Sequence, residues 1–167
     1  MQRDYASHSV RHYVDLDPAE ILGRLAAERA VARLNPGKLP SGTMSIVFDP
    51  RVGSSLIGHL IGAITGSAIT RKTSFLLGRE GEQIFAPGIT VRDDPHRARA
   101  LRSKPFDGEG LPTAPRNLVE DGRLTGWLLD SASARQLGRR PTGHASRGVG
   151  GSPSAGATNL DLLPGPI

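Results

Sequence analysis

The run around His59 is the first place to look for chemistry, because histidine is both a common metal ligand and a common acid–base group near neutral pH. A metal site built on one helix needs a second ligand or an acid within about one turn. The positions three to five residues on either side of His59 hold only Ser, Leu, Gly, Ala and Ile. This helix by itself therefore supplies at most one ligand, and we predict no metal site on it.

The other histidines give weaker signals. His8 and His12 lie four residues apart, which could place two ligands on one helix face, but no acid lies between them and their flanks show no helical pattern. His144 lies in a polar loop, where it could face a cleft, although an exposed loop histidine is the favoured interpretation.

Two carboxylates, Asp107 and Glu109, lie beside the flexible backbone of Gly108 and Gly110. They could bind a peptide amine or a cation, and a tight turn between strands is the favoured interpretation. The sequence has no nucleophile elbow, phosphate-binding loop or dinucleotide-binding motif. We therefore assign no catalytic residue and keep His59, Asp107, Glu109 and His144 as candidates for a cleft or a partner contact.

An amphipathic helix is predicted over residues 17–35. Asp17 and Pro18 form a start signal, apolar residues recur at helical spacing, and Asn35-Pro36-Gly37 ends it. A Pro- and Gly-rich linker follows over 37–42, and then 43–48 has the composition of a buried strand. We place a domain boundary near residue 42, with 1–42 as the end of a preceding central domain.

Residues 52–70 form the longest weakly polar run. Its apolar residues favour one buried face of a soluble helix, and Gly58, Gly62 and Gly66 would let a neighbouring element approach closely. The run is nearly long enough to span a membrane, but its Gly, Ser, Thr and His content disfavours that alternative.

Strand signals dominate the rest of the chain. Short strands are expected at 75–77, 83–85 and 89–92, and Asp121-Gly122 predicts a tight hairpin between 116–120 and 123–129. A short helix over 131–137, a flexible loop over 146–157 and a last strand over 158–163 complete the pattern. The last strand would leave an open sheet edge, so we expect marginal stability or association.

These elements predict an α+β fold, mainly an antiparallel sheet with a packed glycine-rich helix, preceded by the amphipathic helix of another domain. The net charge is +5, but the Arg residues are scattered and no aromatic residues lie among them, so nucleic-acid binding is disfavoured. There is no cysteine and no apolar stretch typical of a signal peptide near the start.

The order of several short motifs resembles the TldE (PmbA) branch of the TldD/PmbA peptidase family. The matching segments run through nearly the whole chain: 3–5, 38–40, 58–64, 71–77, 81–85, 105–107 with 109–110, 127–129 with 133–135, and 142–145. In the TldD branch the helix that corresponds to 57–62 carries His-Glu-x-x-x-His, in which two histidines hold zinc and the Glu activates water. Here that motif is absent.

The resemblance implies a cytoplasmic, heterodimeric metallopeptidase that acts on peptides, in which the TldD-type partner holds the zinc and this chain binds none. It also implies a partial C-terminal domain over 43–167, with further sequence on both sides. Two alternatives stay open at this point: an independent peptidase or hydrolase with an unrecognised site, and a basic adaptor that binds nucleic acid.

Overall fold

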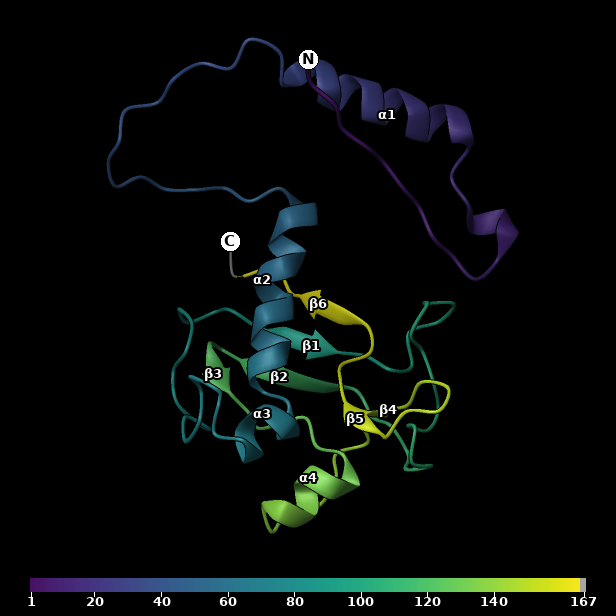
Figure 1. The fold of residues 1–167 in the computed structure, drawn as a ribbon, viewed down its shortest axis with the longest axis vertical. Coiled ribbons are helices and arrows are strands. Elements are labelled where there is room, and N and C mark those ends of the chain that lie inside the picture. The colour runs from purple at the N-terminus through teal and green to yellow at the C-terminus, as the bar shows by residue number, and fades with distance from the viewer. Residues whose placement is uncertain (166–167) are drawn as a thin grey trace. The chain divides into compact units, whose positions relative to one another are not determined.

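A computed structural model describes residues 1–165 of the chain (Figure 1). The chain divides into two compact units, Met1–Val47 with Arg99–Leu101, and Phe48–Ala98 with Arg102–Ile167. The division between 47 and 48 lies a few residues after the boundary expected near residue 42.

The first unit holds a short 3-10 helix, η1 (Tyr13–Asp15), and α1 (Ala19–Ala32). Residue 18 takes the N-cap position of α1, so Pro18 lies at the start signal that the sequence predicts. α1 is shorter than the expected 17–35, and it has no buried residue along its described length. Its apolar side chains therefore do not form a core within this unit.

The expected strand over 43–48 is wrong. These residues are extended and exposed and form no strand. Ile46 keeps 68% of its surface exposed and Val47 keeps 97%. Strand propensity reflects packing against neighbours on a pleated surface, so an apolar and β-branched composition does not by itself produce a strand.

The second unit begins with α2 (Pro50–Ala63), which Asp49 caps through a side-chain bond from the Arg51 N–H. The single helix expected over 52–70 is wrong, because α3 (Gly66–Thr70) is a separate helix. The break occurs where the backbone bonds to another segment: the Leu128 N–H donates to Ile64 O at 2.9 Å, and the Gly66 N–H donates to Leu128 O at 2.7 Å. These bonds replace the helical ones at 64–66.

A four-stranded antiparallel sheet forms the centre of the second unit, in the order β3-β2-β1-β6. The strands are β1 (Val91–Asp93), β2 (Arg116–Glu120), β3 (Arg123–Leu124) and β6 (Leu160–Leu162). Asp121 and Gly122 both have positive φ, 48° and 76°, as a type I′ hairpin turn requires. The α+β fold class and the hairpin are therefore confirmed.

Several strand predictions are wrong in detail. Residues 75–77 form a turn, 83–85 make only an isolated bridge from Gln83 to Arg123, and the strand expected over 123–129 ends at Leu124. The apolar residues at 127–129 are buried, but a bridge to the α2–α3 break takes the place of a continued ladder. These residues are apolar because they are buried, and their composition resembles that of a strand although they do not form one.

The remaining elements lie towards the end of the chain. α4 (Ser131–Gln136) forms at the expected place, with Asp130 as its N-cap. The segment expected to be a flexible loop over 146–157 instead holds part of a two-stranded antiparallel sheet, β4 (Ala145–Ser146) and β5 (Ser154–Ala155). The last expected strand, over 158–163, is present as β6 and pairs with β1.

One apolar core joins α2 and α3 to the sheet, with α2 lying across the sheet in Figure 1. Leu60, Ala63 and Ile64 at the end of α2 belong to the same buried cluster as Val91, Leu118, Val119 and Leu124. Within the described residues, no helix is long and apolar enough to cross a membrane.

Candidate functional site

α2 presents His59 to solvent. The buried residues of this helix are Leu60 and Ala63, and they face the core. His59 precedes Leu60 by one residue, so its side chain points off the packed face. Among residues 1–165, no group of three His, Asp or Glu side chains lies together in a way that could hold a metal ion.

The three glycines expected to pack on this helical run differ from one another. A Cβ added at Gly66 would lie 2.1 Å from Ser133 Oγ, so α3 and α4 approach each other closely at this residue. At Gly58 and Gly62, no described atom lies within 4 Å of an added Cβ, apart from the helix's own backbone. The expectation that these two pack closely is therefore wrong within the described chain, because they lie on the exposed surface of α2.

Asp107 is buried and holds two loops together. Its Oδ1 accepts from the N–H groups of Glu109 and Leu111, both at 2.9 Å, and its Oδ2 accepts from the Ala145 N–H at 3.0 Å. The favoured turn interpretation of 106–110 agrees with this geometry. With three backbone donors, this carboxylate is engaged inside the protein and is not presented to a ligand.

Glu109 supports the start of α4. Its Oε2 accepts from the Ser131 N–H at 2.8 Å and from the Ser131 hydroxyl at 2.7 Å. Ser131 is the first residue of α4, whose first N–H groups have no partner inside the helix. Glu109 therefore caps α4 from a distance in sequence, beside the local cap that Asp130 provides to the Ser133 N–H at 2.7 Å.

His144 is buried, which corrects the favoured view of it as an exposed loop residue. Its Nδ1 lies 2.8 Å from Thr142 Oγ1, and its Nε2 lies 3.3 Å from Asp93 Oδ2. The second distance is within the range of an ion pair. No hydrogen bond reaches Asp93 Oδ2, so this contact is electrostatic only. Asp93 Oδ1 accepts from the N–H and the hydroxyl of Thr158, at 2.9 and 2.6 Å. We call these four residues the Asp93 network.

The order Thr142, His144, Asp93 resembles the chain of nucleophile, base and acid in hydrolases. Its surroundings argue against that role. The Thr142 hydroxyl accepts from the Leu129 N–H at 2.8 Å and lies 3.3 Å from Leu129 O, and both His144 and Asp93 are buried. A nucleophile needs a free hydroxyl within reach of substrate, so the Asp93 network is structural.

A further charged group lies beside this network. Arg116 pairs with Asp93 across β2 and β1. Burial lowers the pKa of the Arg116 guanidinium, and the Glu80 and Asp93 carboxylates oppose that shift. The cation therefore faces carboxylates at the half-buried end of the sheet, where it partly offsets the charge of Asp93.

The four candidates do not form one cleft. Asp107 bonds to the residue that follows His144, Glu109 reaches α4, and His59 lies on the surface of α2. Sequence reasoning missed Asp93, Thr142 and Thr158, which complete the buried network. Asp93 follows a predicted strand, and a carboxylate at a strand end was the one available signal.

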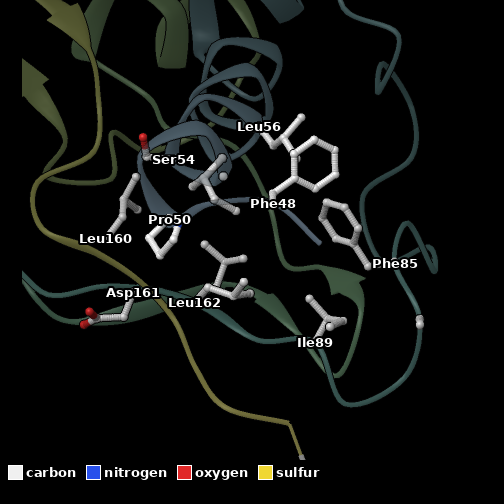
Figure 2. A pocket seen from close by; sticks show the side chains of 13 residues that line it. Phe48, Pro50, Ser54, Leu56, Phe85, Ile89, Leu160, Asp161 and Leu162 are labelled. Carbon is white, nitrogen blue, oxygen red and sulfur yellow. The ribbon is translucent and has the colours of Figure 1, made fainter. Parts of the chain in front are cut away.

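An open apolar pocket of about 920 Å³ lies between the start of α2 and β6 (Figure 2). Phe48 and Leu56 line its helix side, while Ile89, Leu160 and Leu162 line its sheet side, and Phe85 closes one end. The one charged lining residue, Asp161, makes a salt bridge to Arg97. We call this pocket the α2–β6 groove.

Comparison with known proteins adds independent information. The sequence model of a family described as the PmbA/TldA metallopeptidase C-terminal domain matches residues 41–167. Metalloprotease PmbA from Escherichia coli O157:H7 is 44% identical over 145 residues, which cover 87% of this chain and 32% of that protein. The chain thus spans about a third of the length of the curated relatives it matches.

Solved structures show the same relationship. A crystal structure of a candidate modulator of DNA gyrase from Bacteroides thetaiotaomicron matches with a TM-score of 0.81 and 31% identity, over 93% of this chain and 33% of that chain. TldE from Thermococcus kodakarensis matches with a TM-score of 0.59 and 31% identity, over 64% of this chain and 24% of its own.

Proposed function

The chain belongs to the PmbA/TldA metallopeptidase family, and on that premise we propose that it is a TldE (PmbA) type, non-metal-binding subunit of a heterodimeric peptidase. In this proposal a TldD-type partner holds zinc and hydrolyses peptides. This chain supports the partner and shapes the shared cleft. We further propose that the complex works in the cytoplasm.

The observation that carries the proposal is the surface of α2. The TldD branch carries His-Glu-x-x-x-His at this place, whereas here the exposed face holds His59 between Gly58 and Gly62. A single exposed imidazole does not fit the two-histidine and glutamate chemistry that a metallopeptidase requires. The described residues therefore do not fit the metal that the family name implies, and we derive no metal-dependent step from them.

The other candidate residues support the same role. Asp107, Glu109 and His144 all contact backbone groups or side chains of this chain. These contacts hold the loops and α4 in place. A subunit that shapes a cleft needs rigid loops of this kind more than it needs reactive groups.

Co-expression of the chain with a TldD-type subunit tests the proposal. We expect the two to co-purify, with zinc in the complex that is lost when the partner's His-Glu-x-x-x-His motif is changed and kept in His59→Ala. Absence of association would contradict the heterodimer. Stoichiometric zinc in the chain alone, lost in His59→Ala, would favour the alternative of an independent peptidase.

A further inference from the structure

The two ring nitrogens of His144 face different kinds of atom inside the Asp93 network. Nδ1 lies 2.8 Å from Thr142 Oγ1, a hydroxyl that can donate or accept. Nε2 lies 3.3 Å from Asp93 Oδ2, and an ionised carboxylate oxygen can only accept. His144 is 3% exposed and Asp93 is 0% exposed, so neither side chain can turn to water. These surroundings therefore decide which nitrogen carries the proton of the neutral ring.

The Thr142 side of the ring adapts to either tautomer. Thr142 Oγ1 accepts from the Leu129 N–H at 2.8 Å and lies 3.3 Å from Leu129 O, to which the hydroxyl can donate. Its one proton can point to Leu129 O or to His144 Nδ1, and the contact with Nδ1 is the shorter of the two at 2.8 Å. His144 Nδ1 thus has a hydrogen-bond partner whichever nitrogen carries the ring proton.

The Asp93 side of the ring does not adapt. Asp93 Oδ1 accepts from both the N–H and the hydroxyl of Thr158, at 2.9 and 2.6 Å, and these two bonds fix the orientation of the carboxylate. Asp93 Oδ2 is buried and accepts no hydrogen bond, so it needs a compensating positive group nearby. A bare lone pair on His144 Nε2 would place a second acceptor against it, whereas an N–H at Nε2 directs the positive end of a bond dipole towards it.

We propose that the neutral ring of His144 carries its proton on Nε2, with the Thr142 hydroxyl donating to Nδ1 and the Nε2–H directed at the Asp93 carboxylate. His144 is then a positioning residue that holds segment 142–145 against β1. The backbone of this residue is engaged as well, because the Gly156 N–H donates to His144 O at 2.9 Å. The tautomer decides whether the ring attracts or repels the one buried oxygen that the protein leaves without a hydrogen bond.

Nitrogen-15 spectra of the histidine rings test the tautomer directly. They are recorded on the 167-residue chain at mildly alkaline pH, and the His144 signals are assigned by their loss in His144→Gln. We expect the Nε2–H pattern in the wild type and the Nδ1–H pattern in Asp93→Asn. In that variant the Thr158 N–H keeps the amide oxygen on its own side, so the amide NH₂ faces Nε2 and requires an acceptor there. An Nδ1–H ring in the wild type, or the same tautomer in both proteins, would overturn the proposal.

Unfolding equilibria of two variants give a second test. The His144→Gln side chain places its amide NH₂ near the position of Nε2, whereas the His144→Asn side chain reaches only as far as Nδ1. We expect His144→Asn to raise the unfolding equilibrium constant about 5- to 30-fold more than His144→Gln, since only the longer amide keeps a donor for Asp93. The control is His59→Gln on the exposed surface of α2, which should change the constant by less than about threefold. Equal losses in the two His144 variants, or a smaller loss in His144→Asn, would contradict the proposal.

Discussion

His59 and His144 are the same residue type in opposite environments. His59 lies on the exposed surface of α2 near Gly58 and Gly62, where an added Cβ would meet no atom of the described residues beyond its own helix within 4 Å. His144 is enclosed by Thr142 and Asp93 in a buried network. The buried region holds the fold together, whereas the α2 surface and the α2–β6 groove are open to solvent in the described residues. This difference predicts that changes in the first region affect stability and changes in the second affect association.

The largest expected effect comes from Asp93→Ala. It removes the acceptor of both Thr158 bonds and the charge that faces His144 and Arg116, so we expect a loss of about 3–5 kcal/mol in the free energy of unfolding. Denaturant unfolding measures this loss. The control is Asp161→Ala, which removes an exposed pair with Arg97 and should cost less than about 1 kcal/mol. Equal losses would show that burial of the network has no special importance.

Alanine scanning of the three glycines sharpens the same comparison. Gly66→Ala should destabilise the protein by about 1–3 kcal/mol, because its Cβ would meet Ser133. Gly58→Ala and Gly62→Ala meet open space inside a helix and should stabilise it by about 0.5–1 kcal/mol each. Thermal unfolding measures the effect. The melting temperature should fall in Gly66→Ala and rise in Gly58→Ala and Gly62→Ala, and a rise in all three would contradict the close contact at Gly66.

Glu109→Ala tests the long-range cap. It leaves the Ser131 N–H without its acceptor, so we expect a loss of about 1 kcal/mol in the free energy of unfolding. Glu109→Gln keeps one carbonyl oxygen at the cap and should lose less. If both variants match the wild type in urea, Glu109 does not support α4.

The smallest effect is expected from His59→Ala. The side chain is exposed and does not belong to the apolar core, so the free energy of unfolding should change by less than about 0.5 kcal/mol. Calorimetry of the chain alone checks this value. A loss as large as that of Asp93→Ala would mean that the α2 surface contributes to the fold and would remove the contrast between the two regions.

Local signals predicted the elements that form through local contacts. The Asp121-Gly122 turn, β2 and α4 with its Asp130 cap all occur as expected, because turn and cap residues act within a few positions of themselves. Local signals failed for the segments 43–48 and 127–129, which were both expected to form strands. Both are apolar, but one is exposed and the other is buried without strand pairing. Apolar composition indicates that a segment tends to be buried, but it does not indicate which part of the structure buries it.

The candidate site divides in the same way. The sequence by itself determined the family, the α+β class and the absence of a zinc motif around His59, since these depend on residue identity and order. Only the tertiary structure decided that Asp107 and Glu109 are acceptors for distant N–H groups and that His144 is paired with Asp93. Such contacts join residues about 20 to 50 positions apart, and their partners are set by the packing of loops against the sheet, which no local pattern encodes.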